Sequence, residues 1–230
     1  MEVLARFSGR SGEITIFEEP ATGARLYYEA GVYQSYVLSG GKAGLAYVRL
    51  MARVLSGGSD VLLFGCGGGA LASELHAGGA RVLVTDDNAI SFEIARRYFW
   101  MPHAVGCSVT DMASFLVTRS AAYPAIGVDV GGPCFDYDAV LDEGTCALLR
   151  RRLAPDGVIA VNIACDSAED STPQRIATRL RAQDLDVWLC EEAPATREHN
   201  AVLVAHDGRA RDDDITAIAD TLGFHAHRIA

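Results

Sequence analysis

The stretch DVLLFGCGGGALASELHAGGARVLVTDD, residues 60–87, sets the frame for the whole chain. It begins with an apolar run that has the length of a buried strand. A turn almost without side chains follows at 65–69, then a helical segment, then a second apolar run that ends at Asp86 and Asp87. This order predicts the first β-α-β unit of a doubly wound parallel sheet.

The glycine turn also predicts a ligand. Glycines let the chain turn tightly and let a ligand approach backbone N–H groups at the start of a helix. A carboxylate after the next strand can accept hydrogen bonds from a ribose diol. The letters GCGGGA fit the dinucleotide pattern GxGxxA and also the GxGxG form that suits S-adenosyl ligands. The form of the turn, and the 59 residues that precede the unit, favour an S-adenosyl ligand over NAD.

The length and charge of the chain limit the classes of partner that it is expected to bind. The chain has 230 residues, enough for one α/β domain with a small appendage. Its 20 basic and 30 acidic residues give a net charge of −10, which argues against nonspecific binding to nucleic acid or an anionic membrane and is compatible with amine substrates. The first residues lack the features of a signal peptide, and no apolar run approaches the roughly 20 residues of a membrane span. We expect a cytoplasmic protein.

Cysteine and histidine spacing predicts no metal site. The six cysteines lie far apart without a CxxC pair, so we interpret them as reduced thiols of the core. The six histidines show no metal-ligand spacing, and we expect His225 and His227 to lie in a mobile tail.

Hydrophobic patterning divides the chain into two parts. Residues 1–40 alternate in the manner of strands, with a hairpin signal at PATG (20–23), and form a small N-terminal β region. Residues 41–230 alternate between helical and strand patterns, which favours a mostly parallel sheet with helices on both faces. The last two strands follow each other too closely for a helical crossover and should pair antiparallel. The helices expected in this part are 43–55, 70–77, 90–99, 112–119, 140–153, 173–182 and 214–222; the strands are 61–64, 81–84, 104–110, 125–130, 158–163, 186–191 and 200–205.

Polar residues follow successive strands of this part. The glycine turn, Asp86 or Asp87, Asp111 and Asp129 each come at a strand end. Ligands of open α/β sheets bind outside the carboxyl ends of the strands, so these residues predict one pocket. Asp111 is also placed to cap the helix that begins at residue 112, and we expect either role or both.

Taken together, these motifs resemble the spermidine synthase (polyamine aminopropyltransferase) family, as a short divergent bacterial member. The resemblance rests on LYYEAGVYQSYVL, VLLFGCGGGALASEL, EIARRYF, VTDMASFL and YPAIGVDVGGP, in the family's order along nearly the whole chain. It implies a class I S-adenosylmethionine-methyltransferase-like (Rossmann-like) fold. It also implies S-adenosylmethionine or its decarboxylated form as cosubstrate, a small amine or other small nucleophile as partner, and a homodimer.

The resemblance also implies roles for individual residues. Gln34 would hold the ribose or the substrate, Asp86 or Asp87 the ribose hydroxyls, and Asp129 would lie near the sulfonium and the nucleophile. The remaining residues of the expected cosubstrate pocket are Gly65, Gly67, Gly69, Asp111 at the adenine amino group and Met112 beside the ring. Tyr33 is a weaker candidate for substrate contact.

Two departures from the family pattern limit the functional prediction. The family carries aspartates where this chain has Gly68 and Gly132, and aminopropyl transfer uses such acids to orient the amine and take its proton. Asp136 and Asp138 could substitute for them, or could be solvated loop acids and a helix cap. We expect the missing side chain at position 68 to leave more room at the cosubstrate's tail, which the extra carboxylate of S-adenosylmethionine could use.

Three functions therefore remain open. The first is a transferase that moves an aminopropyl-type group to a small amine, although not by standard spermidine synthesis. The second is a small-molecule methyltransferase that uses S-adenosylmethionine. The third is a binding protein that retains the adenosyl pocket without catalysis.

Overall fold

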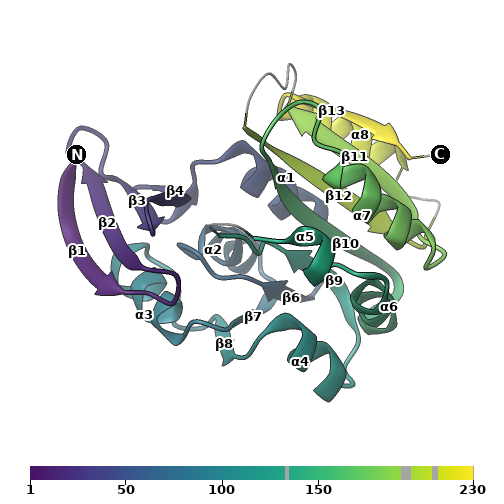
Figure 1. Cartoon of the computed structure of the whole chain (residues 1–230), viewed down its shortest axis with the longest axis horizontal. Coiled ribbons are helices and arrows are strands. Elements are labelled where there is room, and N and C mark those ends of the chain that lie inside the picture. Colours follow the sequence, from purple (N-terminus) through teal and green to yellow (C-terminus); the bar gives the residue numbers. More distant parts are fainter. Residues whose placement is uncertain (133–134, 193–197, 209–211, 230) are drawn as a thin grey trace.

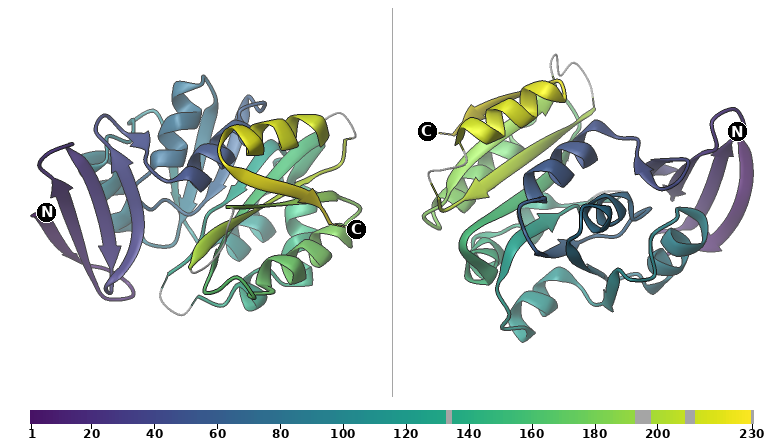
Figure 2. Two further views of the ribbon diagram at one scale, coloured as in Figure 1. Left: turned by 90° about the horizontal axis from the view of Figure 1, so that it is seen from above. Right: turned by 180° about the vertical axis from the view of Figure 1, so that it is seen from behind.

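A computed structural model of the chain contains two β-sheets and eight helices in the parts that it describes, residues 1–132, 135–192, 198–208 and 212–229. The N-terminal sheet lies at one end of the molecule, and the C-terminal strands lie at the other (Figure 1). Two further views place the termini at these opposite ends (Figure 2).

The N-terminal sheet is an antiparallel meander. Its five strands pair in chain order, and Pro20–Gly23 connects the second to the third as the sequence predicts. Ile14, Ile16 and Tyr27 point inward from this sheet and are buried against the main domain. The strands are β1 (Glu2–Ser8), β2 (Glu13–Glu19), β3 (Ala24–Glu29), β4 (Val32–Leu38) and β5 (Lys42–Ala43).

The main sheet has eight strands in the order β13-β11-β12-β10-β9-β6-β7-β8. The five strands from β10 to β8 run parallel, and β12 pairs antiparallel with both β10 and β11. The doubly wound sheet and its antiparallel closing strands are therefore confirmed. The strands are β6 (Asp60–Phe64), β7 (Arg81–Asp86), β8 (Gly106–Val109), β9 (Tyr123–Val128), β10 (Leu153–Cys165), β11 (Asp186–Glu192), β12 (His199–His206) and β13 (Phe224–Arg228).

Helices cover both faces of this sheet and create two cores. Val61 and Leu63 of β6 pack in one core with α1, α2, α3 and α8, whereas Leu62 and Phe64 pack in the other with α4, α6 and α7. This alternation follows from the two-residue period of a strand. The helices are α1 (Ala46–Leu55), α2 (Ala70–Ala77), α3 (Ala89–Tyr98), α4 (Met112–Thr118), α5 (Tyr137–Val140), α6 (Glu143–Arg152), α7 (Thr172–Arg181) and α8 (Asp212–Thr221).

Two predicted helices differ from the structure. The helix expected from residue 43 begins at Ala46, because Ala43 pairs with Val37 in β5. The helix expected over 140–153 begins only at Glu143, because the Asp142 carboxylate accepts a hydrogen bond from Thr145 N at 2.7 Å and caps α6 there; Val140 is the last residue of the separate helix α5. A side chain that caps the backbone in this way competes with helix continuation.

The predicted mobile tail is wrong. Gly223 ends the last turn after α8 with φ +81°, and the chain then forms β13 on β11. Phe224 is buried in the first core, so apolar burial and strand pairing hold this segment in place. His225 and His227 are exposed residues of this strand.

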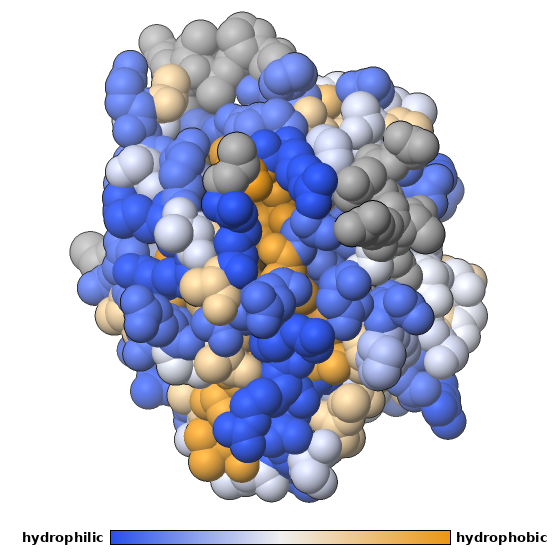
Figure 3. All heavy atoms as spheres, turned by 90° about the vertical axis from the view of Figure 1, so that its right-hand side faces the viewer, coloured by the Kyte–Doolittle hydropathy of each residue, from blue (hydrophilic) through white to orange (hydrophobic). Residues whose placement is uncertain are grey.

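No helix in the ranges described above is long and apolar enough to cross a membrane. The face seen in Figure 3 is mostly hydrophilic, with apolar side chains in a central stripe and in a smaller group at its lower left.

Candidate active site at the carboxyl ends of the parallel strands

Strand register places four residues in one row. Phe64 of β6 pairs with Thr85 of β7 and Val128 of β9, and Val128 pairs with Val161 of β10. The next residues along these strands, Asp86, Gly65, Asp129 and Asn162, therefore lie side by side at the carboxyl edge of the sheet. This is the edge where open α/β sheets bind their ligands.

A large cleft opens over this row, with a volume of about 1170 Å³. That is enough for a nucleoside and a second small molecule, since single-ligand sites span roughly 300–1,000 Å³. Among the described residues of its wall, Arg10 is the only Lys or Arg, and ten side chains are carboxylates. These are Glu29, Asp86, Asp87, Asp111, Asp129, Asp136, Asp138, Asp142, Asp166 and Asp170.

Gly65 is required at the start of the turn. A Cβ there would lie 2.0 Å from the Asp129 carbonyl oxygen, and its φ of +94° favours glycine. The backbone of β6 and β9 can come this close only without a side chain at position 65. The glycine turn therefore brings the Asp129 backbone against the start of the turn.

Asp86 connects the glycine turn to the next helix. One carboxylate oxygen accepts a hydrogen bond from Cys66 N at 2.8 Å, and the other accepts one from Asn88 N at 2.8 Å. Burial raises the pKa of Asp86, and the two hydrogen bonds oppose the shift. Asp87 is more exposed and forms an ion pair with Arg10 of the β1–β2 loop. Both acids line the cleft, but only Asp86 is integrated into the turn.

Asp129 is the most distinctive group of the row. Its Oδ1 accepts a hydrogen bond from Asn162 Nδ2 at 2.9 Å, and the hydroxyl of Tyr47 on α1 also hydrogen-bonds to its carboxylate. Burial raises the pKa of Asp129 to about 6, although both hydrogen bonds favour the charged form. A carboxylate with this pKa can change protonation state near neutral pH, as proton-transfer groups do.

Sequence reasoning missed Tyr47 and Asn162. Tyr47 is one of the inward residues of a predicted amphipathic helix, where an aromatic residue suggests core packing. The available signal for Asn162 was its polarity inside the apolar run VIAVNIAC at the end of a predicted strand. A buried amide in such a run calls for a specific hydrogen-bond partner.

Asp111 caps α4 and also borders the cleft. Its Oδ1 accepts from Ser114 N at 2.9 Å, and this bond lowers the pKa of Asp111. Met112, the first residue of the helix, is buried in the cleft wall beside it. The predicted cap is therefore present, and Asp111 also lines the cleft.

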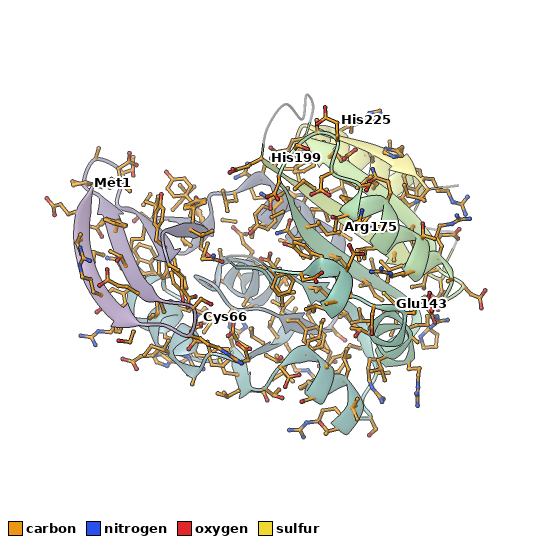
Figure 4. All side chains as sticks on the ribbon, viewed as in Figure 1. Met1, Cys66, Glu143, Arg175, His199 and His225 are labelled. Atoms are coloured by element: carbon orange, nitrogen blue, oxygen red, sulfur yellow. The ribbon has the colours of Figure 1, made fainter. Side chains whose placement is uncertain are left out.

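The N-terminal sheet supplies the opposite wall through β4. Tyr33 and Gln34 line the cleft, and the Ser35 hydroxyl accepts a hydrogen bond from Gly68 N at 2.9 Å. Figure 4 marks Cys66 in the glycine turn on this side of the molecule. Gly67 has φ +48°, and a Cβ there would lie 2.7 Å from Ser35 Oγ. Thus β4 and the glycine turn fit each other without side chains between them.

Gly69 takes a different position. Its φ is +70°, and a Cβ there would lie 2.8 Å from Met101 Sδ. It precedes α2, and its α-carbon faces the segment after α3.

No group of three or more His, Cys, Asp or Glu residues in the described parts could hold a metal ion.

Comparison with known proteins places this geometry in context. No protein-family model matches the chain, and no curated protein matches it. Among solved structures, a probable spermidine synthase from Corynebacterium glutamicum superposes with a TM-score of 0.86 at 16% identity, covering 99% of this chain and 91% of that one.

Two further spermidine synthase structures are similar. One is in complex with the transition-state analogue AdoDATO and has a TM-score of 0.75 at 17% identity, covering 92% of this chain and 76% of that one. The other, from Thermotoga maritima, has a TM-score of 0.71 at 16% identity, covering 92% and 75%. The chain has a spermidine-synthase-like fold.

Within this spermidine-synthase-like fold, the two glycines at the expected acid positions are in different surroundings. A Cβ on Gly68 would lie 3.1 Å from Ser35 Cβ and from Val37 Cγ2, and 3.3 Å from Phe99 Cδ1. The expectation that position 68 leaves room for a tail is therefore wrong, because its neighbours fill that space. Among the described residues, no atom lies within 4 Å of a Cβ added to Gly132, although its φ of +155° favours glycine.

The two replacement acids have structural partners. Asp136 caps α5 by accepting a hydrogen bond from Ala139 N at 3.0 Å. Asp138 pairs with Arg175 at 2.6 Å and with Arg179 at 2.9 Å, and the hydrogen bond from Arg175 lowers its pKa. Both acids line the cleft, so a contact with substrate stays a prediction. Pro133 and Cys134 lie outside the described residues.

Proposed function

We propose that this protein is a transferase that binds S-adenosylmethionine or its decarboxylated form in the acidic cleft and moves an aminopropyl-type group to a small amine. The observation that carries the proposal is the half-buried Asp129 carboxylate, held by Tyr47 and Asn162 at the centre of a spermidine-synthase-like cleft. A carboxylate held there suits a reaction in which an amine loses a proton.

The row of strand ends fits a nucleoside. Asp86 offers carboxylate oxygens to the ribose hydroxyls, and it lies beside backbone N–H groups of the glycine turn. Asp111 and Met112 offer an acceptor and an apolar surface to the adenine. Gln34 and Tyr33 close the cleft from β4. Asp87, already paired with Arg10, is the weaker of the two ribose candidates.

The cosubstrate supplies a carbon made electrophilic by its bond to a sulfonium. An amine attacks that carbon in line; the new C–N bond forms, and the electron pair of the breaking C–S bond goes to sulfur. The Asp129 carboxylate orients the amine and receives its proton. Ionised Asp129 also stabilises positive charge that passes from sulfur to nitrogen.

Charge favours the decarboxylated cosubstrate over S-adenosylmethionine. The described wall of the cleft offers Arg10 alone as a cation, and Asp87 already pairs with it. A cosubstrate with an added carboxylate would meet ten acids and little compensation, whereas a sulfonium with a free amine is doubly cationic.

The proposal is tested by incubating the protein with each sulfonium compound and a panel of amines, with products identified by mass spectrometry. We expect methylthioadenosine from the decarboxylated cosubstrate, and loss of that product in Asp129→Asn. S-adenosylhomocysteine would instead identify a methyltransferase, and tight binding without product a binding protein. A melting-temperature shift with NAD but with neither sulfonium compound would overturn the ligand assignment.

A further inference from the structure

One ion pair joins the two walls of the cleft. Arg10, in the loop between β1 and β2, pairs with Asp87, which directly follows β7, and both side chains line the cleft. The remaining ion pairs of the N-terminal sheet stay within that sheet. Among the described residues, the Arg10–Asp87 pair is therefore the only ion pair between the N-terminal sheet and the main sheet.

The loop that carries Arg10 is held in place by its neighbours. Gly9 N donates a hydrogen bond to Gly12 O at 2.7 Å, and Ser11 N donates one to Glu29 Oε1 at 3.1 Å. A Cβ added to Gly9 would clash with the same Glu29 oxygen, so Glu29 also fills the space beside this residue. The residues on either side of Arg10 are thus fixed to the sheet, while its long side chain reaches Asp87.

The pair lies at the outer rim of the cleft. Asp86 is partly buried, and both of its carboxylate oxygens accept hydrogen bonds from the backbone. The side chains of Arg10 and Asp87 are 66% and 45% exposed. Because Asp87 is the next residue after Asp86, the exposed pair lies beside the position proposed for the ribose and closer to solvent.

Pairing with Arg10 also separates the duties of the two adjacent acids. Burial is the main cause that raises the pKa of Asp86, and the charges of Asp87 and Glu29 raise it further. Arg10 offsets the charge of Asp87 and engages its carboxylate. Asp86 is then the acid that remains for the ribose hydroxyls while the pair is formed.

We infer that the Arg10–Asp87 pair is a strap across the nucleoside end of the cleft, and that Arg10 sets the rates at which nucleosides enter and leave. The inference rests on the proposed function. Exposed ion pairs are weak and open readily, which suits a gate better than a structural brace. A strap that closes equally over the empty and the occupied cleft slows entry and release by the same factor, so it leaves the affinity unchanged.

The test variants are Arg10→Glu, Asp87→Arg and the two changes together. Each single change places like charges at the strap, and the double variant restores an ion pair with its signs reversed. The matched control is Arg6→Glu, which breaks an exposed arginine–carboxylate pair inside the N-terminal sheet. Surface plasmon resonance with the full chain measures the association and dissociation rate constants of methylthioadenosine.

We expect each single variant to raise both rate constants about two- to fivefold and to keep the dissociation constant within about twofold. This change corresponds to about 0.4–1 kcal/mol at 1.4 kcal/mol for each factor of ten, which is the size of an exposed ion pair. The double variant should return both rate constants to those of the unchanged protein, and Arg6→Glu should not alter them. Retained affinity shows that the variants are folded.

Ionic strength provides a second readout of the strap. Salt screens exposed charges, with a Debye length of about 10 Å at 0.1 M and about 3 Å at 1 M. Raising the salt concentration should therefore raise both rate constants of the unchanged protein. It should not raise those of Arg10→Glu, in which the strap is already open. Methylthioadenosine is neutral, so salt does not act on the ligand's own attraction to the cleft.

Three outcomes would overturn the inference in different ways. Rate constants that stay unchanged in both single variants would exclude the strap. Faster dissociation alone, with weaker affinity, would show that Arg10 or Asp87 contacts the nucleoside directly instead of closing over it. No binding of methylthioadenosine or of either sulfonium compound to the unchanged protein would overturn the proposed function, and this inference with it.

Discussion

At the scale of single residues, the raised pKa of Asp129 lowers the stability of the folded protein at neutral pH. Its pKa is raised from 3.8 to about 6, so the folded protein holds a proton on this group at pH values where the unfolded chain does not. Its contribution therefore favours folding at low pH and is lost as the pH rises through about 4 to 6. Above that window the buried charge is a net cost, of at most about 3 kcal/mol for a shift of about two units.

Replacing Asp129 with Asn should therefore stabilise the protein at pH 8 and leave its stability unchanged at pH 4. The amide keeps an acceptor for Tyr47 and carries no charge to desolvate. Thermal unfolding at both pH values measures the effect, which is about 2–4 °C for each kcal/mol in a chain of this size. The control is Asp87→Asn, an exposed acid that should show no gain, and an equal gain at both pH values would contradict the explanation.

Gly132 and Gly68 are the two positions where the resemblance expects an aspartate, and the structure predicts opposite effects of placing one there. Gly132→Asp should be accommodated, because no described residue has an atom within 4 Å of its Cβ, at a cost of about 1–3 kcal/mol for φ +155°. Gly68→Asp should destabilise the protein by several kcal/mol, because it drives a carboxylate against Ser35, Val37 and Phe99.

Denaturant unfolding and diamine turnover distinguish these two variants. We expect Gly132→Asp to increase turnover of 1,4-diaminobutane several-fold, because a second carboxylate can orient the attacking ammonium. Unimpaired stability of Gly68→Asp would show that the turn can rearrange around a side chain.

At the scale of secondary-structure elements, the short helix α5 is tied down from two sides. Ala164 N donates to the Tyr137 hydroxyl at 3.0 Å, and Asp138 binds Arg175 and Arg179 of α7. Figure 4 shows Arg175 on α7 beside α5. A four-residue helix has little stability of its own, so these contacts fix its place at the cleft.

If Asp138 acts by tying α5 to α7, its effect on amine KM should depend on its two arginine partners. We expect Asp138→Ala to raise KM a few-fold, Arg179→Ala to raise it less because Arg175 still pairs with Asp138, and the double variant to raise it no further than Asp138→Ala. The double-mutant cycle is measured on turnover with 1,4-diaminobutane. Additive effects would instead indicate that Asp138 contacts the substrate directly.

At the scale of the whole molecule, acidic side chains gather around the cleft. The net charge of −10 is concentrated at the cleft, where ten carboxylates and Arg10 line the described wall. The field of such a cleft attracts cations and weakens as salt screens it, with a Debye length of about 10 Å at 0.1 M.

Salt should therefore weaken the binding of a diamine and spare that of a neutral nucleoside. Raising ionic strength from about 0.05 to 0.5 M should reduce 1,4-diaminobutane affinity roughly tenfold and change methylthioadenosine affinity by less than twofold. Calorimetry at several salt concentrations measures both. Parallel losses for the two ligands would mean that salt acts on the fold and not on the field.

The sequence by itself determined the main features of the fold. Strand and helix periods are local properties, so the β-α order, the glycine turn and the closing antiparallel strands followed from patterning. Gly65 was predictable for the same reason, because a glycine turn between strand and helix has few alternatives. The errors fell where local signals compete, as at Asp142, whose side chain caps α6 and places its first residue after the expected start at residue 140.

Only the tertiary structure decided which residues surround Asp129. Tyr47 and Asn162 lie 82 and 33 residues away in the chain, and they meet Asp129 because helix packing and strand register bring them together. The same is true of Ser35, Val37 and Phe99 around Gly68. Long-range packing cannot be read from one segment's periodicity, since the same apolar pattern would permit many neighbours.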